Sequence, residues 1–209
     1  MTVKLISATP NAEELITYCA RVSNPQNQEL NPDSEKLIKY LIKHKHWSPF
    51  EMAHVVMEIN TTRAIAAQIL RHRSFSFQEF SQRYATAIPN PKPPDLRRQD
   101  HTNRQNSFDD LPQEEVQKLQ TRAQILFNES KKLYDEMLSK GVARECARDV
   151  LPLCTPTRLY MAGSVRSWIH YIDLRMSNGT QKEHRQIAMD CHKVLAWELP
   201  NVCNVLWQI

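Results

Sequence analysis

Residues 71–83, RHRSFSFQEFSQR, concentrate groups that could bind an anion. Crowded arginines repel one another, so their charge must be balanced by water, a carboxylate or an anionic ligand. For residues 71–73 alone, solvated charges near a helix C-terminus are the favoured interpretation, because the helix dipole stabilises cations there. The residues that follow change this balance, since Glu79 and Arg83 are spaced to pair and Ser81 lies between them. Arginine forks and hydroxyl groups together bind phosphate well, so the segment predicts an anion site.

A second set of charged residues lies on the predicted helix 163–176. Arg166, His170 and Asp173 fall at i, i+4 and i+7 and therefore share one stripe. Arg175 lies about 180° away, on the other side of the helix. One monomeric core cannot bury both cationic faces cheaply, because each unpaired charge would lose its hydration. Two interpretations stay open: one face meets water, or both faces line ligand pockets.

Other charged groups carry less weight. Arg144 and Arg148 form an i, i+4 pair, for which ion pairs with Glu145 or Asp149 are the favoured interpretation. The stretch HKHWSPFEMAH holds an HxH pair and a distant histidine, which is weak evidence for zinc. No metal ion is predicted.

The composition excludes several classes of protein. Three glycines cannot build GxGxxG or GxxxxGK[ST], so a Rossmann dinucleotide site and a P-loop are ruled out. Five cysteines without a CxxC pair argue against a disulfide framework and a zinc ribbon, and most are expected to be buried, inert thiols. The formal net charge of +4 does not by itself imply polyanion binding. No apolar run approaches the ~18 residues of a membrane span, and residues 1–10 are no secretory signal, so a cytoplasmic location is expected.

Hydrophobic periodicity predicts one α+β domain, residues 1–209, with more helix than strand. Strands are predicted at 3–9 and 50–62, and helices at 11–23 (capped by Asn11), 33–45 (capped by Asp33 or Ser34), 63–73, 113–141, 142–152, 163–177 and 181–199. Residues 86–112 hold five prolines and almost no periodicity, so this long loop is expected to be functional or disordered. Phe75, Phe77 and Phe80 are expected in the core.

The segment 71–83 also resembles a known family. Arg71-His72-Arg73, seven further residues and Ser81-x-Arg83 match the signature of the flavin-dependent thymidylate synthases, the ThyX family. The stretches HWSPFE, ARECARDVLP and VRSWIHYIDLR resemble further segments of that family, so the resemblance covers most of the chain.

The resemblance implies a fold, an assembly and a reaction. The implied fold is one compact domain with helices around a small, largely antiparallel sheet, assembled as a homotetramer whose active sites are shared between subunits. The implied activity is the reductive methylation of dUMP to dTMP for de novo thymidylate synthesis. Methylenetetrahydrofolate donates the carbon, and FAD reduced by NADPH carries the hydride.

The resemblance also implies which residues bind the ligands. The implied FAD positions are Ser48, Arg71, His72, Arg73, Glu79, Ser164, Val165, Arg166 and His170, and some family members have asparagine in place of Ser164 and His170. The implied dUMP positions are Gln68, Ile69, Leu70, Arg71, Glu79, Phe80, Ser81, Gln82, Arg83, Arg148 and Arg175. Arg175 is assigned the catalytic role, because a guanidinium can stabilise the negative charge that develops on the N3–O4 side of uracil. One such donor in a dry pocket is worth roughly 3–4 kcal/mol.

Two other functions are weighed against this enzyme. A nucleic-acid-binding module would use the arginines of 71–83, with PPDLRRQDHTNR as a basic arm, and its affinity would fall steeply with salt. The mild net charge and scattered acidic residues make this the weaker choice, so no nucleic-acid or membrane partner is predicted. A folate- or nucleotide-binding protein without catalysis is the third possibility, which a turnover assay would separate from the enzyme.

Overall fold

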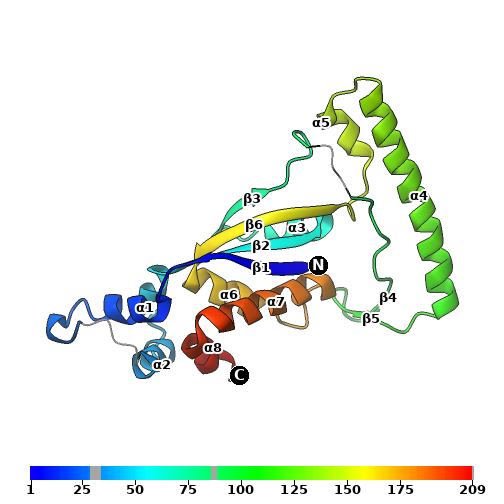
Figure 1. Ribbon diagram of the computed structural model, residues 1–209. Coiled ribbons are helices and arrows are strands. Elements are labelled where there is room, and N and C mark those ends of the chain that lie inside the picture. The colour runs from blue at the N-terminus through cyan, green and yellow to red at the C-terminus, as the bar shows by residue number, and fades with distance from the viewer. Residues whose placement is uncertain (29–33, 86–88, 209) are drawn as a thin grey trace.

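A four-stranded antiparallel sheet forms the centre of the structure, a computed structural model that describes residues 1–28, 34–85 and 89–208. Its strands, in the order β1-β2-β6-β3, are β1 (Thr2–Ala8), β2 (His54–Thr62), β6 (Pro156–Ser164) and β3 (Ser76–Glu79). All three pairings are antiparallel. Together with the surrounding helices, this sheet confirms the compact α+β fold that the sequence predicts (Figure 1).

One face of the sheet forms the core. The side chains of β2 alternate between buried and less buried positions, as expected for a strand with one covered face. Met57 lies opposite Met161, and Ile59 opposite Leu159, on β6. All four are fully buried, so these cross-strand pairs hold the two central strands in register.

Three C-terminal helices cover this face: α6 (Val165–Arg175), α7 (Lys182–Glu198) and α8 (Pro200–Trp207) (Figure 1). Helix α7 packs on β1 and α6, and α8 packs on α7 and on α2 (Glu35–Lys43). Trp168 and Tyr171 of α6 are fully buried, and the Trp168 Nε1–H donates to the Val55 carbonyl at 3.0 Å. The α6 face towards the sheet is therefore fixed by large aromatic side chains with satisfied polar groups.

The helix predicted over 63–73 ends earlier than expected. Helix α3 covers Arg63–Ile69, and the backbone N–H of His72 donates to the Ile69 carbonyl at 3.1 Å, so residues 71–73 form a turn. Phe75, buried as predicted, anchors this turn against Gly163 of β6. A Cβ at Gly163 would lie 2.5 Å from the Phe75 ring, so only glycine allows this close approach. Phe77 packs against the main core and Phe80 against a second, smaller cluster.

A long arm stands apart from the sheet (Figure 1). Its main element is helix α4 (Gln113–Ser139). The helix ends before Gly141, as predicted, and Gly141 adopts the left-handed conformation (φ 81°) that glycine favours after a helix. Helix α5 (Arg144–Ala147) and the 3₁₀ turn η3 (Arg148–Val150) then pack against α4. The predicted loop 86–112 contains a short hairpin of β4 (Arg98–Gln99) and β5 (Ser107–Phe108), and residues 86–88 lie outside the described part.

The remaining elements are α1 (Ala12–Ala20), η1 (Pro25–Asn27) and η2 (Ser48–Glu51). Asn11 and Ser34 occupy the predicted N-cap positions, but neither side chain makes a capping hydrogen bond, and Asp33 lies outside the described residues. Cys191 and Cys203 are buried, as predicted, whereas Cys146 is exposed and two further thiols are partly exposed. Among the described residues, no helix has the length and apolar character to cross a membrane, and no group of His, Cys, Asp and Glu could hold a metal ion.

Candidate active site

The first polar cluster lies at the C-terminal end of α3. The Nε–H of Arg175, the last residue of α6, donates to Nε2 of His72 at 2.9 Å. Burial, with smaller contributions from the charges of Arg175 and His170, lowers the pKa of His72 to about 4. The imidazole is therefore neutral at physiological pH and accepts the guanidinium hydrogen bond without a second positive charge.

Arg71 and Arg73 flank His72 and are exposed. Within residues 1–28, 34–85 and 89–208, neither side chain has an ion pair or a hydrogen bond. The two charges follow the C-terminus of α3 and are left for water or an anionic ligand.

A hydrogen-bonded group adjoins this cluster in the interior. Tyr171 Oη lies 3.1 Å from His184 Nε2, and His184 Nδ1 lies 3.3 Å from Gln68 Oε1. Gln68 Nε2 in turn donates to Gln181 Oε1 at 2.7 Å. Burial lowers the pKa of His184 to about 4, with further contributions from Arg175 and His72. His184 was not predicted as a site residue, because it lies within the predicted helix 181–199 and belongs to no motif.

The second polar cluster lies at the other end of α3. Glu79 accepts from Arg63 Nη1 at 3.0 Å and from the Thr157 hydroxyl at 2.9 Å. Arg63 also donates through Nη2 to the Phe80 carbonyl at 2.9 Å. The predicted Glu79–Arg83 pair is wrong, because Glu79 ends a β-strand and the extended chain rises about 3.3 Å per residue, unlike a helix.

Arg83 pairs instead with Glu145 Oε2 at 3.0 Å. Arg144 donates to the Tyr84 carbonyl at 3.1 Å and forms no ion pair within the described part of the chain. Arg148 keeps a long contact of 4.0 Å with Asp149, the partner expected from the sequence. Residues 79–84 thus lie beside α5 and η3, so Arg148 of η3 lies near the cluster around Glu79.

The sequence-predicted dUMP positions therefore fall into two groups. Gln68, Arg71 and Arg175 lie at the C-terminal end of α3, whereas the positions around Glu79 lie near its N-terminal end. Helix α3 spans seven residues, or roughly 10 Å at about 1.5 Å per residue, which separates the two groups within one chain. Ile69 and Gln82 are buried.

The third feature is a cavity of about 560 Å³ beside α6. It is lined by Trp47, Glu51, Ser74, Arg166, Ser167, Ile169, His170, Asp173, Leu206 and Trp207. The stripe of Arg166, His170 and Asp173 faces this cavity, whereas Arg175 turns away to His72. The Arg166 face is exposed to water and also borders this cavity, whereas Arg175 on the other face is partly buried beside His72.

Hydrogen bonds at the start of α6 shape the base of this cavity. Glu51 accepts from Arg166 Nη1 at 3.1 Å and from the Ser164 hydroxyl at 2.5 Å. The Ser164 hydroxyl also accepts from the Ser167 backbone N–H at 3.2 Å and so caps the helix. Val165 is fully buried, and Ser48 is exposed on η2. Glu51, Trp47 and Trp207 were not predicted as site residues, although the stretch HWSPFE contains both Trp47 and Glu51.

The cavity fits a flavin by the chemistry of its lining. Arg166, 50% exposed, and His170 supply hydrogen-bond donors that suit phosphate oxygens, and Ser74 adds a hydroxyl. Two indole rings with Ile169 and Leu206 supply apolar walls, and 560 Å³ falls within the ~300–1,000 Å³ of small-molecule sites.

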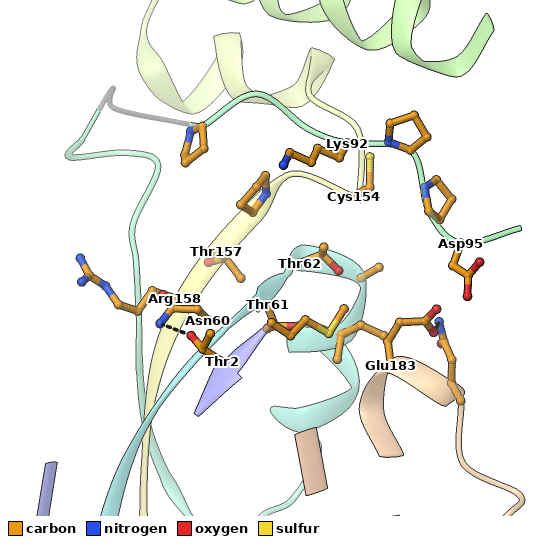
Figure 2. Close-up of a pocket in the computed structure, with 18 of the residues that line it drawn as sticks. Thr2, Asn60, Thr61, Thr62, Lys92, Asp95, Cys154, Thr157, Arg158 and Glu183 are labelled. Atoms are coloured by element: carbon orange, nitrogen blue, oxygen red, sulfur yellow. Dashed lines mark hydrogen bonds between the residues drawn. The ribbon is translucent and has the colours of Figure 1, made fainter. Parts of the chain in front are cut away.

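A larger cavity of about 830 Å³ lies beyond the N-terminal end of α3 (Figure 2). It is bounded by β1, β2, β6, the segment from Pro89 to Arg97 and the start of α7. Asp95 of this segment and Glu183 of α7 both border it (Figure 2). Phe80 is its one lining residue among the sequence-predicted site positions, and Thr61 Oγ1 is buried there without a hydrogen-bond partner in the described structure.

Comparison with known proteins agrees with this fold. The fold matches that of a nucleotide methylase, the UMP/dUMP methylase PolB from Streptomyces cacaoi solved with 5-Br dUMP, with a TM-score of 0.86 and 25% identity over 100% of this chain and 95% of that one. A family model described as thymidylate synthase complementing protein matches residues 4–201.

Relatives with higher identity define the family. The chain is 52% identical to the probable flavin-dependent thymidylate synthase of Paramecium bursaria Chlorella virus 1, over 99% of both sequences. It is 55% identical to the flavin-dependent thymidylate synthase of Synechocystis sp., over 93% of this chain and 89% of that one. The chain belongs to the flavin-dependent thymidylate synthases, as its RHR…SxR signature indicates.

Proposed function

We propose that this protein methylates dUMP to dTMP in the cytoplasm, with methylenetetrahydrofolate as carbon donor and FAD, reduced by NADPH, as hydride carrier. Family membership supports the reaction, and residues 1–209 act as a single catalytic domain. The observation that carries the proposal is the cluster at the end of α3. There, Arg71 and Arg73 have no carboxylate partner among the described residues, and Arg175 is held only by a neutral imidazole.

Arg175 is the catalytic residue of this proposal. Its Nε–H is engaged by His72, so the orientation of the guanidinium is fixed while the Nη groups stay available for the uracil. C5 of uracil becomes nucleophilic as negative charge builds on the N3–O4 side, and these N–H groups stabilise that charge. Because the pKa of His72 is lowered to about 4, the imidazole does not compete with Arg175 as a second cation.

The cavity beside α6 holds the flavin in this proposal. Arg166 and His170, which line the cavity, donate to its polar groups. Ser48, Arg73, Ser164 and Val165 are assigned to the same ligand because they match FAD positions of the family. When bound, reduced FAD supplies the hydride that completes the methyl group. The Glu51–Ser164 hydrogen bond keeps the start of α6 in place, so the lining side chains are held ready for the cofactor.

The protein forms a homotetramer whose active sites are shared between subunits. Gln68, Ile69, Leu70, Arg71 and Arg175 of one subunit would bind dUMP together with Glu79, Phe80, Ser81, Gln82, Arg83 and Arg148 of another. The roughly 10 Å between the two groups within one chain supports this arrangement, since a single dUMP contacts both more easily across an interface. The apolar side chains exposed on α4 support assembly as well: Leu119, Ile125, Leu126 and Leu133.

An absorbance spectrum of the purified protein tests the proposal. We expect a yellow, flavin-containing protein whose spectrum changes when dUMP is added, and which forms dTMP from dUMP in the presence of methylenetetrahydrofolate and NADPH. UMP serves as the comparison substrate, because the structural relative PolB is named for both nucleotides. A colourless protein that takes up no added FAD and forms no dTMP would overturn the proposal.

A further inference from the structure

A line of polar side chains runs from the interior of α6 to the proline-rich segment. Tyr171 Oη lies 3.1 Å from His184 Nε2, and His184 Nδ1 lies 3.3 Å from Gln68 Oε1. Gln68 Nε2 donates to Gln181 Oε1 at 2.7 Å, and Gln181 Nε2 donates to Glu183 Oε2 at 2.8 Å.

Arg97 closes the line with a bidentate pair. Its Nη1 and Nη2 donate to the two Glu183 oxygens at 2.6 and 3.0 Å. The Arg97 and Glu183 side chains are only 11% and 19% exposed, so solvent screens this pair weakly. Glu183 also borders the cavity of Figure 2, next to Asp95 of the proline-rich segment, which accepts from the same Arg97 Nη1 at 3.2 Å.

The carboxylate sets the direction of every hydrogen bond in this line. An ionised carboxylate can only accept, so Gln181 must turn its NH₂ towards Glu183 and its oxygen towards Gln68. Burial alone would raise the pKa of Glu183, but hydrogen bonds from Arg97, its own backbone and Gln181 outweigh it and lower the pKa. The acceptor-only state therefore persists at physiological pH.

The orientation of Gln181 in turn fixes the donors and acceptors of Gln68, His184 and Tyr171 at the buried end of the line. Gln68 donates its NH₂ to Gln181 and turns Oε1 towards His184, which must carry its proton on Nδ1. The bare Nε2 of His184 accepts from the Tyr171 hydroxyl. The reverse direction is excluded, because it would place the Gln181 oxygen against a Glu183 oxygen. With Gln181 fixed in this way, a flipped Gln68 amide would set its oxygen against the Gln181 oxygen.

We propose that Glu183, through Gln181, and His184 are positioning residues that fix the orientation of the Gln68 amide towards the nucleotide. Gln68 keeps one N–H and one oxygen lone pair outside this line, and the line decides which of them faces each part of the ligand. The bound ligand class is a pyrimidine nucleoside monophosphate. This inference rests on the proposed function, because it assigns Gln68 to the dUMP site.

The test is the conservative change Glu183→Gln, measured on the purified flavin-loaded protein with dUMP as probe. Arg97 draws the new amide oxygen to itself, so the NH₂ faces Gln181 and reverses the Gln181 and Gln68 amides. We expect dUMP affinity and KM to weaken by roughly fivefold to tenfold, the effect of misplacing about one hydrogen bond. Flavin content and kcat at saturating dUMP are expected to change less than twofold. Glu198→Gln, the same change at the other end of α7, is the matched control and leaves dUMP affinity unaltered.

A second variant separates positioning from a merely structural role. Glu183→Gln combined with Gln181→Glu moves the acceptor-only carboxylate one step closer to Gln68 and restores the original direction of the Gln68 amide. The Arg97–Glu183 charge pair stays absent in this double variant. Recovery of dUMP affinity to within about twofold of the unsubstituted protein supports the positioning role, whereas a structural role predicts no recovery.

Each outcome has one meaning. If the unsubstituted protein neither binds dUMP nor forms dTMP, the proposed function and the inference both fail. If it does both, but Glu183→Gln behaves like Glu198→Gln, the proposed function stands and the inference is overturned. Loss of affinity in Glu183→Gln without recovery in the double variant also overturns it. If Glu183→Gln yields unfolded protein, His184→Asn is compared with His184→Leu, since asparagine retains a donor near Nδ1 and only that variant should keep dUMP affinity.

Discussion

The two ends of α3 differ in whether their arginines have a carboxylate partner. At the N-terminal end, Arg63 is held by Glu79 at 3.0 Å and by the Phe80 carbonyl at 2.9 Å. At the C-terminal end, Arg71 and Arg73 have no partner among the described residues, and Arg175 faces only a neutral imidazole. Arginines at the two ends of one short helix therefore serve different purposes.

The difference separates cations that hold the fold from cations kept for a ligand. A carboxylate at Arg63 satisfies a half-buried charge and fixes where β3 meets β6. Arg71, Arg73 and Arg175 have no carboxylate partner among the described residues, and the repulsion between their charges opposes folding. Such arrangements persist where function needs them, because a binding site is optimised for its ligand rather than for the free protein.

Arg175→Ala should produce the largest effect on this comparison. We expect kcat for dTMP formation to fall by roughly 10²–10³-fold, as for loss of one donor to a developing charge, while the flavin stays bound. Single-turnover assays with the flavin spectrum as a folding check measure both quantities. Arg158→Ala, which removes an exposed β6 cation 3.8 Å from Glu58, is the control and should retain activity. Equal losses in both variants would mean that Arg175 has no special role.

Glu79→Ala should have the next largest effect, and it should lower the stability of the fold in addition to removing the proposed dUMP contact of Glu79. It leaves Arg63, 25% exposed, without its carboxylate while its Nε already lacks a partner in the described structure. We expect the free energy of unfolding to fall by about 2 kcal/mol, less than for a fully buried pair because solvent reaches this one. Glu145→Ala removes the 55% exposed partner of Arg83 and should cost under about 0.5 kcal/mol. Urea unfolding compares the two variants, and similar losses would contradict the distinction between buried and exposed pairs.

The neutral imidazoles make the C-terminal end sensitive to acid. The pKa values of His72 and His184 fall to about 4 in the folded protein from an ordinary value of 6.5. Between pH 6.5 and 4 the unfolded chain therefore binds more protons, so stability is full above pH 6.5 and declines as the pH falls towards 4. Each proton contributes about 1.4 kcal/mol per pH unit within that window. Thermal unfolding from pH 7 to 4.5 measures the decline, and His72→Gln should make it shallower; an unchanged slope would be evidence against a buried neutral His72.

Local pattern was enough to predict much of the fold. Helical spacing located α1, α2, α4, α6 and α7, and alternation located β1 and β2, because each element buries one face. The strand β6 was missed, since Pro156 and Gly163 weaken its local signal and its stability comes from pairing with β2 across the sheet. Strand β3 is four residues long and likewise depends on β6. Helix α8 begins with Pro200 and was missed, because the predicted helix 181–199 ended before it and no helix was assigned to residues 200–207.

The candidate site was predictable in its residue types but not in its pairings. The signature located Arg71, His72 and Arg73, and the stripe argument placed Arg166 and His170 on one face, which the cavity beside α6 confirms. The partner of Glu79 could not be read from helical spacing, because this residue ends an extended strand. Contacts such as that between Gln68 and Gln181 join residues 113 positions apart, and no local pattern encodes them.

Arg71→Ala and Arg73→Ala should have the smallest effect on the fold and therefore sharpen the comparison most directly. Neither side chain has a partner in the described structure, so unfolding free energy should stay within about 0.5 kcal/mol of the original value, as for ordinary surface changes. If repulsion within the cluster opposes folding, the change should be slightly stabilising at low salt and vanish at high salt, because exposed charges are screened. Ligand binding should respond in the opposite sense: loss of one arginine fork should weaken dUMP or flavin binding by roughly tenfold. Urea unfolding at two salt concentrations, paired with dUMP and FAD titrations, distinguishes the two roles. A variant that loses stability as Glu79→Ala does would show that these cations also hold the fold, and the contrast between the two ends of α3 would disappear.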